Sequence, residues 1–374
     1  MKHVDPTHRT IYSELAQRAL DARFTSDFPP DGRFLEWKRN GRSYWYFERK
    51  DETGKNVRKY VGPANDEEIA RRVHEHKRLK ADARQRRKLV STLVREAYLP
   101  KPDPLVGDVV AALSEAGFFR LRGVLVGTIA YGCYPGLLGV RLPDTEQRTQ
   151  DADFAQFHSI SVAVGDRVRD VDEVLRNVDP TFAPVPDQID GRRTTKFANQ
   201  DGFRVEFLTP NTSSDDYGGK PATMPALGGV DATPLRFLDF LIHRPVRAVM
   251  LHRSGVPVTV PDPARYAIHK LVVAHRRRRG GDGEAKDTKD LSQAATLMEA
   301  MVELRRQDDL AEAWIEAWDR GPAWRTAIEA SLGRLNPVLL ENVVPALSKG
   351  LRDLDVDPGE YGFKPTPEPS RKPD

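Results

Sequence analysis

The sequence predicts an α+β fold, and three of its segments carry that prediction. Residues 108–131 have the pattern of a helix followed by an apolar strand and a glycine turn, and residues 203–210 alternate apolar and polar side chains. Residues 308–350 form helix-like segments separated by Gly and Pro. The expected parts are an N-terminal β-hairpin and basic helical arm (1–100), a core (101–255), a helical C-terminal subdomain (256–350) and a disordered Pro-rich tail (351–374).

The length and composition of the chain limit the classes of protein to which it can belong. The chain has 374 residues, 39% of them hydrophobic, and a net charge of +3, so it is long enough for two or three domains and any nucleic-acid signal must come from local clusters. The single cysteine, Cys133, excludes a disulfide framework and a cysteine-based zinc site. The N-terminus lacks an apolar signal segment, and no apolar run approaches the ~20 residues that span a bilayer. We therefore expect a cytoplasmic protein without a membrane partner; the sequence does not indicate its oligomeric state.

The first hundred residues combine aromatic and basic side chains. Two such runs flank a turn at Gly54 and predict a β-hairpin within residues 34–63. Residues 65–99 begin with an N-cap candidate and contain no Gly or Pro, which predicts one long helix. Its many Arg and Lys side chains allow two interpretations. They belong either to a solvated helix paired with its own acids, or to a nucleic-acid arm in which exposed Tyr44, Trp45 and Tyr46 stack on bases.

Three acidic residues are candidates for catalysis. Asp151 and Asp153, in TQDADF, lie two residues apart, so an extended strand points both carboxylates to the same side, where two like charges favour a cation. In FRVEFLTP the alternation places Arg204, Glu206 and Leu208 on one face and the apolar residues on the other. If the apolar face is core, Glu206 faces the same cleft as the aspartates. The alternatives are a surface acidic pair and an exposed Glu206 paired with Arg204.

A glycine turn precedes these acids. Gly127 and Thr128 end the apolar run VLVGTIAY, where backbone N–H groups and a hydroxyl are able to approach a phosphate. Carboxylates hold the divalent metals that such a phosphate requires. Taken alone, a Gly-Thr pair after a strand is an ordinary structural turn. Together with the three acids it indicates phosphoryl or nucleotidyl transfer.

A later segment carries positive charge. In PDPARYAIHKLVV, Asp262 is a helix N-cap and Pro263 the first helical residue, which places Lys270 in an apolar helix interior where it either extends to solvent or serves a ligand. The motif KDTKDL follows, with Lys286 and Asp287; its acids also suit the first turn of a helix.

These motifs resemble the nucleotidyltransferase superfamily with a polymerase β-like fold, and more closely a bacterial family of nucleotidyltransferase-fold proteins. The resemblance covers roughly residues 55 to 335 and rests on several ordered motifs, among them GVLVGTIAY, RTQDADFAQ, VEFLTPN and KDTKDL. It implies a mixed sheet flanked by helices. The implied catalytic and metal-binding residues are Asp151, Asp153 and Glu206, and the implied nucleotide-binding residues are Gly127, Thr128, Lys270, Lys286 and Asp287. One departure is that Thr128 stands where Gly or Ser is commonest, and the stretch between the turn and the aspartates is longer than in the simplest members.

The expected activity is metal-dependent transfer of an NMP from an NTP to an acceptor hydroxyl. Two Mg²⁺ ions, with Mn²⁺ as the other candidate, would be held by the three carboxylates, and Lys270 would neutralise the triphosphate. The acceptor is left open between RNA, with a tRNA 3′ end and a toxin-like role as one form, a protein hydroxyl and a small molecule such as an aminoglycoside. A second class of hypothesis is a non-catalytic nucleic-acid-binding or regulatory protein on the same scaffold.

Overall fold

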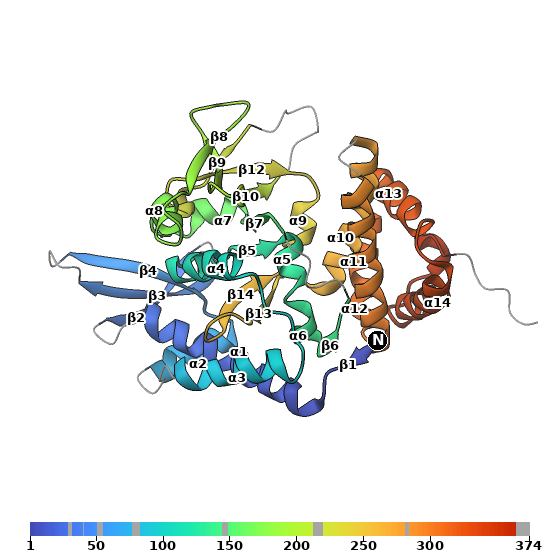
Figure 1. Cartoon of the computed structure of the whole chain (residues 1–374), viewed down its shortest axis with the longest axis horizontal. Helices are drawn as coiled ribbons and strands as arrows, with labels where there is room; N and C mark the ends of the chain where they lie inside the picture. Colours follow the sequence, from blue (N-terminus) through green and yellow to red (C-terminus); the bar gives the residue numbers. More distant parts are fainter. Residues whose placement is uncertain are drawn as a thin grey trace, which may run out of the picture. The chain divides into compact units, whose positions relative to one another are not determined.

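The computed structural model describes residues 1–28, 32–39, 41–50, 55–76, 83–143, 149–211, 220–280 and 284–363. The chain divides into two compact units, Lys2–Pro261 and Asp262–Asp374 with Met1. The first unit holds a mixed sheet with helices and the second is helical, so the α+β fold is confirmed (Figure 1). The turn expected at Gly54 and the tail from residue 364 lie outside the described residues.

A mixed sheet forms the centre of the first unit. Its main path runs in the order β11-β12-β10-β7-β5, with β9 also paired to β10 and β8 to β9. Strands β7, β10 and β12 are parallel where they pair, whereas β5 is antiparallel to β7 and β9 to β10. The strands are β5 (Val124–Val126), β7 (Asp151–Ala155), β8 (Ala183–Pro186), β9 (Thr194–Ala198), β10 (Arg204–Pro210), β11 (Ala222–Thr223) and β12 (Asp231–Leu235).

Aromatic side chains fill the core on one face of this sheet. Phe154 and Phe207 are fully buried and stack at a centroid distance of 5.9 Å, and the ring of Phe118 lies 5.3 Å from that of Phe154. Helix α4 (Pro104–Ala116) precedes Phe118 and ends at Gly117, whose φ of 98° is the left-handed C-cap that the sequence indicates. The core therefore fixes β7 and β10 from the apolar side.

Shorter elements complete the first unit. A hairpin of β13 (Val246–Met250) and β14 (Val256–Val260) contacts β5, α4 and the N-terminal helix. The remaining short helices are α5 (Gly127–Tyr131), α6 (Tyr134–Leu138), α7 (His158–Ala163), α8 (Val171–Arg176), η2 (Pro225–Leu227) and α9 (Leu238–Leu241).

The N-terminal segment contains a helix that the sequence analysis missed. Helix α1 (Pro6–Asp27) starts with Pro6, and the Asp5 side chain accepts a hydrogen bond from the Thr7 N–H. It contributes to an apolar cluster with α3 and β13, and β1 (Lys2–His3) pairs with β6 (Val140–Arg141). The first hundred residues therefore pack within the same compact unit as the sheet.

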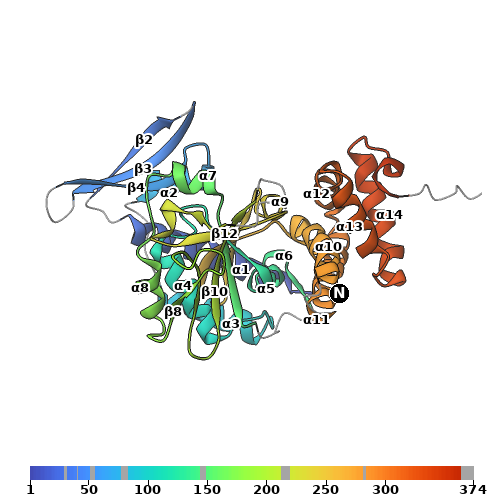
Figure 2. The ribbon, with the colours of Figure 1, turned by 90° about the horizontal axis from the view of Figure 1, so that it is seen from above.

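The expected hairpin is part of a three-stranded antiparallel sheet, in the order β2-β3-β4, drawn as a long ribbon in Figure 2. Its strands are β2 (Arg33–Arg39), β3 (Arg42–Lys50) and β4 (Asn56–Pro63). One face packs against α1 and α2, with Phe34, Trp45 and Phe47 joining the cluster around Phe24 and Phe28. Trp45 therefore faces this core and does not share a surface with its neighbours in sequence, contrary to the expectation of three exposed aromatics in a row.

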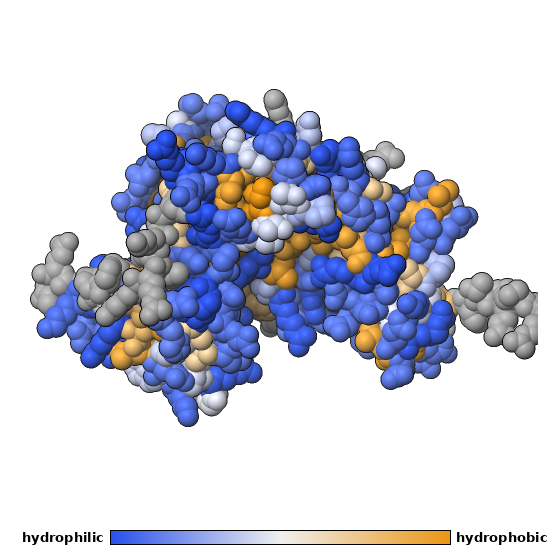
Figure 3. Space-filling model, turned by 90° about the horizontal axis from the view of Figure 1, so that it is seen from below, coloured by the Kyte–Doolittle hydropathy of each residue, from blue (hydrophilic) through white to orange (hydrophobic). Residues whose placement is uncertain are grey.

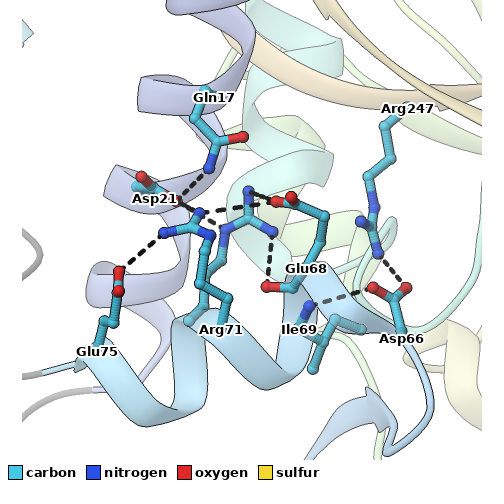
Figure 4. Close-up of polar contacts among 9 residues, drawn as sticks. Gln17, Asp21, Asp66, Glu68, Ile69, Arg71, Glu75 and Arg247 are labelled. Atoms are coloured by element: carbon cyan, nitrogen blue, oxygen red, sulfur yellow. Dashed lines mark hydrogen bonds and ion pairs between the residues drawn. The ribbon is translucent and has the colours of Figure 1, made fainter.

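The expected long helix appears as two helices, α2 (Glu67–Glu75) and α3 (Ala83–Arg95), and residues 77–82 lie outside the described part. Two arginines of α2 make ion pairs. Arg71 and Arg72 both contact Asp21 of α1, at 2.9 and 2.8 Å, and Arg71 also lies 3.1 Å from Glu75 (Figure 4). These two side chains therefore join α2 to α1. The pair of Arg71 with Glu75 is the expected pairing within the helix, whereas the pairs with Asp21 are to another helix and Arg72 is buried.

The second unit is a bundle of helices, visible in Figure 2. It consists of α10 (Pro263–Gly280), α11 (Glu284–Glu303), α12 (Gln307–Asp319), α13 (Pro322–Leu332), α14 (Pro337–Asp353) and η3 (Pro358–Tyr361). The side chain of Asp262 accepts hydrogen bonds from the N–H groups of Ala264 and Arg265, so it caps α10 as the sequence indicates. Helix α14 and η3 extend ordered structure past residue 350, where the sequence predicted the start of a disordered tail.

A buried ion-pair cluster joins α10 to α11. Asp290 is 1% exposed, and its two carboxylate oxygens lie 2.5 Å from Lys270 Nζ and 2.5 Å from Arg277 Nη1. A buried charge is tolerated only when its partners replace the lost hydration. Asp290 is thus the anion that allows Lys270 to be buried in this unit.

Figure 3 shows one face of the molecule, which is hydrophilic over most of its area with apolar side chains in a few patches. Among the helices of the described ranges, none is both long and apolar enough to cross a membrane.

We predict that Asp290→Asn lowers the unfolding free energy by roughly 3–5 kcal/mol, because the change leaves Lys270 buried without its anion. Asp309→Asn, which removes the exposed pair with Arg306 (2.6 Å), is the control and is expected to cost about 0–1 kcal/mol. Chemical denaturation of both variants measures the difference. Equal losses in the two variants would contradict the structural role of Asp290.

Candidate active site

The sheet brings the three predicted acids onto two adjacent strands. In the parallel pairing of β7 with β10, Asp153 is opposite Glu206 and Asp151 is opposite Arg204. Residues opposite one another in a sheet project to the same face, and residues two apart on a strand do likewise. The intervening Ala152 and Val205 are fully buried on the other face. The alternation seen in the sequence therefore has the predicted orientation, except at Leu208, which is 6% exposed and belongs to the core.

Gly127 lies directly beside Asp153. Gly127 follows β5, and the last residue of that strand, Val126, is opposite Asp153. The φ of Gly127 is 67°, in the left-handed region. A Cβ at this position would stand 2.4 Å from Asp153 Oδ2. Glycine is therefore required here twice, by the backbone conformation and by the close approach of the carboxylate. Thr128 follows in α5 and is half-buried.

A lysine that sequence reasoning did not select completes this row. Lys196 of β9 is opposite Glu206, and its Nζ lies 3.1 Å from Glu206 Oε1. Thr195 and Phe197 on either side are buried, so the alternation in TTKFA was a signal that Lys196 points away from the core. Its pairing with Glu206 depends on strand order, which local sequence does not carry. The row thus reads Lys196, Glu206, Asp153 and Val126 across four strands.

The acids have different surroundings. Asp151 is exposed, and its Oδ1 accepts a hydrogen bond from the Thr149 hydroxyl. Asp153 and Glu206 are half-buried. In the described part of the chain, no three His, Cys, Asp or Glu side chains are grouped so that they could hold a metal ion together. The ion pair with Lys196 accounts for part of this, because it draws the Glu206 carboxylate toward β9.

The donor set nevertheless fits a hard divalent cation. Carboxylate oxygens are the ligands that Mg²⁺ and Mn²⁺ prefer, and adjacent parallel strands lie about 4.8 Å apart, so Asp153 and Glu206 start from neighbouring backbone positions. Asp151 is two residues along the same face as Asp153. The Glu206 carboxylate pairs with Lys196, so an ion shared by the three acids would require this side chain to turn toward the aspartates.

A cavity of about 470 Å³ lies beside the glycine turn and the start of β7. Thr128 and Thr149 are among its lining residues, with Tyr12, Cys133 and Val249 supplying apolar wall. Its size falls within the range of small-molecule sites. The N-terminal helix and the β13 strand contribute to the wall, and sequence reasoning had no signal that these distant segments meet Thr128.

The other nucleotide-binding candidates lie in the helical unit. Lys270 is held by Asp290, and its Nζ lies 5.2 Å from the centre of the Tyr266 ring. Asp287 is 3% exposed and accepts two hydrogen bonds from Arg334, at 2.9 and 2.7 Å. Lys286 is exposed. Packing thus gives Lys270 and Asp287 a structural role, and nucleotide binding by these three residues stays a prediction.

Comparison with protein families identifies the class to which this fold and site belong. A family model described as "Nucleotidyltransferase" matches residues 104–319, more than half of the chain. The chain therefore belongs to this nucleotidyltransferase family, and the resemblance seen in the sequence is confirmed. A second family model, described as a domain of unknown function, matches residues 7–71. No curated protein and no solved structure matched the chain.

The Gly127 contact yields a prediction with a matched control. Gly127→Ala and Gly165→Ala both place a side chain on a left-handed backbone, at φ 67° and 64°, which costs roughly 1–2 kcal/mol in each case. Only at Gly127 does the new Cβ meet another side chain, since nothing lies within 4 Å of that position at Gly165. We expect Gly127→Ala to lose at least about 1 kcal/mol more unfolding free energy than Gly165→Ala. Equal losses would show that Asp153 is not held against Gly127.

The cavity wall yields a second prediction. Burial raises the pKa of the Cys133 thiol to about 12, so the reactive thiolate is almost absent at pH 8. In the native protein Cys133 is expected to react with a disulfide reagent such as Ellman's reagent at least ~100-fold more slowly than in urea. Rapid modification of the native thiol would show that solvent enters this wall.

Proposed function

We propose that this chain carries out the nucleotidyl transfer that its family supports, with an NTP as the substrate that this activity implies, on the sheet face that Asp151, Asp153 and Glu206 share. The observation that carries the proposal is the in-register row in which Glu206, Asp153 and the β5–Gly127 turn stand side by side. These are the acidic and small residues that the sequence analysis selected independently.

In this proposal Asp151 and Asp153 hold divalent metal, with Glu206 as a further ligand or as the base that accepts the proton of the acceptor hydroxyl. Bound Mg²⁺ or Mn²⁺ would neutralise the phosphates of the NTP and lower the pKa of the acceptor hydroxyl. The acceptor oxygen forms a bond to the α-phosphorus, the bond to the β-phosphate oxygen breaks, and pyrophosphate leaves.

Gly127 and Thr128 are proposed to contact the triphosphate, and the adjoining cavity to take the rest of the nucleotide. Because a Cβ at Gly127 would meet the Asp153 carboxylate, the turn lies as close to this acid as backbone can. Lys196 adds a positive charge to the same face, 3.1 Å from Glu206. A phosphate on this face therefore meets a cation as well as the acids.

We propose RNA as the acceptor. A toxin-like action on tRNA and a cytoplasmic location stay predictions that rest on the sequence alone.

A second candidate function has one observation in its favour. Glu206 is paired with Lys196, and no three-carboxylate group exists among the described residues. A chain that uses the scaffold only to bind nucleic acid needs no carboxylate cluster. The two functions differ in their response to loss of Asp153.

The test uses the purified protein with each α-labelled NTP, Mg²⁺ and total cellular RNA. Asp153→Asn is expected to lower label transfer by roughly 10³-fold, because it removes a charge on which nucleotide transfer depends. Asp172→Asn, at an exposed acid of α8 paired with Arg176 (3.0 Å), is the control and should retain transfer. Omitting Mg²⁺ should have the same effect as Asp153→Asn. Full transfer by Asp153→Asn would refute the assignment, and nucleic-acid binding without transfer by the wild type would favour the second candidate.

A further inference from the structure

A second cavity, of about 560 Å³, is lined by arginines and lies in the first unit. We call it the arginine pocket. Its walls come from α1, β4, the start of α2, the loop between α4 and β5, and the β13–β14 hairpin. The arginines that line it are Arg23, Arg72, Arg120, Arg122, Arg244 and Arg247, and the lining acids are Asp27 and Asp66.

Acids inside and around the pocket neutralise four of these arginines. Arg247 lies 2.6 Å from Asp66 (Figure 4). Arg72 lies 2.8 Å from Asp21. Arg23 pairs with Asp27 and Arg120 with Asp166, both at 2.6 Å. Each of these four arginines has a carboxylate partner, so they do not supply the excess charge of the pocket.

Two arginines carry that excess. Among the residues that the structure describes, Arg122 and Arg244 have no carboxylate partner, and both are exposed. Arg120 adds an unused donor, because its side chain is 10% exposed and its Nε has no hydrogen-bond partner within those residues. Burial, and next the charge of Arg120, lower the pKa of nearby Lys59. The pocket is therefore a positive site with hydrogen-bond donors to spare.

The backbone at both exposed arginines is unusual. Arg122 has a φ of 64° and Arg244 a φ of 49°, in the left-handed region that costs a non-glycine residue roughly 1–2 kcal/mol. Such conformations concentrate where a side chain must be aimed for function. Both arginines line the same cavity, and the guanidinium group of Arg122 also makes a hydrogen bond with the Tyr60 side chain. A phosphate accepts hydrogen bonds from such planar groups in pairs.

An aromatic surface leads to this pocket. On the side of the β2-β3-β4 sheet opposite the Phe24 cluster, Trp37 stands opposite Tyr44 and its ring lies 5.9 Å from that of Tyr46. Trp37 is 51% exposed. The ring of Tyr46 lies 5.7 Å from that of Tyr60, and Tyr60 lines the arginine pocket. We call the surface of Trp37, Tyr44 and Tyr46 the aromatic face. Tyr60, which is 3% exposed on the edge strand β4, adjoins both this face and the pocket, whose lining also includes Phe24 and Phe28 from the other side of the sheet.

Basic residues surround the aromatic face. The Arg58 guanidinium lies 4.6 Å from the centre of the Trp37 ring. By strand alternation the cations on the same face as Tyr44 and Tyr46 include Arg33, Arg42, Lys50 and Arg58. Glu48 lies on this face too and pairs with Arg33 at 2.6 Å and with Arg58 at 2.7 Å, which leaves Arg42 and Lys50 in excess. Stacking surfaces beside guanidinium groups suit a chain of bases joined by phosphates, whereas an acidic peptide would leave the rings unused.

We propose that the arginine pocket and the aromatic face together bind single-stranded nucleic acid, with a phosphate between Arg122 and Arg244 and bases on Trp37, Tyr44 and Tyr46. The strand must be single because bases in a duplex are not free to stack on side chains. Arg122 precedes β5 and Gly127 follows it, so five residues of extended chain, or at most about 16 Å, separate the pocket from the candidate active site. That this nucleic acid is the acceptor rests on the proposed function; its binding does not.

The test measures fluorescence anisotropy of a labelled 12-nucleotide single-stranded RNA with the full chain over a range of salt concentrations. R122Q/R244Q is expected to weaken binding at least ~10-fold and to reduce the slope of log K against log[salt] by about 0.7, the contribution of the one phosphate contact that is lost on a single strand. R176Q/R352Q removes two exposed arginines elsewhere and should bind as the wild type does. Equal loss in both double variants, or in neither, overturns the proposal.

A second variant separates stacking from charge. W37A is expected to weaken RNA binding about 10-fold with an unchanged salt slope, because a stacked base is lost and no phosphate contact is. Circular dichroism of each variant confirms that it is folded. A duplex of the same sequence should bind clearly more weakly, and a mononucleotide at equal nucleotide concentration should not displace the RNA. Equal binding of the duplex, displacement by the mononucleotide, or wild-type affinity of W37A would each overturn the proposal.

The two proposals fail in different ways. Asp153→Asn should bind RNA with wild-type affinity while losing transfer, and R122Q/R244Q should lose RNA affinity while keeping metal-dependent NTP binding. If the wild type binds RNA through the pocket but transfers nothing to it, the acceptor role fails and the binding site stands. If transfer proceeds and R122Q/R244Q binds RNA as the wild type does, the binding site fails and the active site stands.

Discussion

The parallel pairing of β7 with β10 is the constraint on which the candidate active site depends. It places Asp153 opposite Glu206, while their neighbours Ala152 and Val205 enter the core. A slip of β10 by one residue relative to β7 would turn Glu206 into the apolar layer, where an unpaired charge is very costly. The stacked rings of Phe154 and Phe207 oppose such a shift. The position of the acids is thus enforced from the buried face of the sheet.

Like charges on adjacent strands repel, and the structure relieves this repulsion in the absence of any ligand. Lys196 compensates Glu206 from the neighbouring strand β9, and the Thr149 hydroxyl donates to Asp151. Each contact is half-exposed or exposed, so each is weak enough to exchange when a stronger cation arrives. The row of acids therefore combines fixed backbone positions with side chains that are free to change partners.

Residue type and spacing along the chain were enough to predict the parts of this fold that depend on short-range interactions. The orientation of Glu206, the turn at Gly127, the glycine cap of α4 and the Asp262 cap of α10 all follow from residue type and spacing. The sequence did not predict which strands pair, because the pairing of β7 with β10 joins residues about 50 positions apart. Lys196 was missed for that reason. In the N-terminal segment, the Asp5 and Pro6 signals for α1 were present in the sequence and were overlooked.

Charge runs were harder to interpret than apolar patterns. The basic residues of the expected long helix suggested a nucleic-acid arm, yet Arg71 and Arg72 are committed to Asp21. Arg122 and Arg244, the arginines of the pocket that have no carboxylate partner among the described residues, lie in connecting loops, where no run of like charges marks them. The sequence does not show which charged side chains have an oppositely charged neighbour in the fold. A charged ligand binds to those whose charge is not compensated by such a neighbour.

The strand β10 has two successive neighbours on one side. Its first half, at Arg204 to Glu206, pairs with β9, and its second half, at Leu208 to Pro210, pairs with β12. The β8–β9 hairpin is thus an appendage that occupies only the acidic half of the strand's free edge. A change in this hairpin would therefore change the residue that faces Glu206, while the pairing of β7 with β10 would keep its partners.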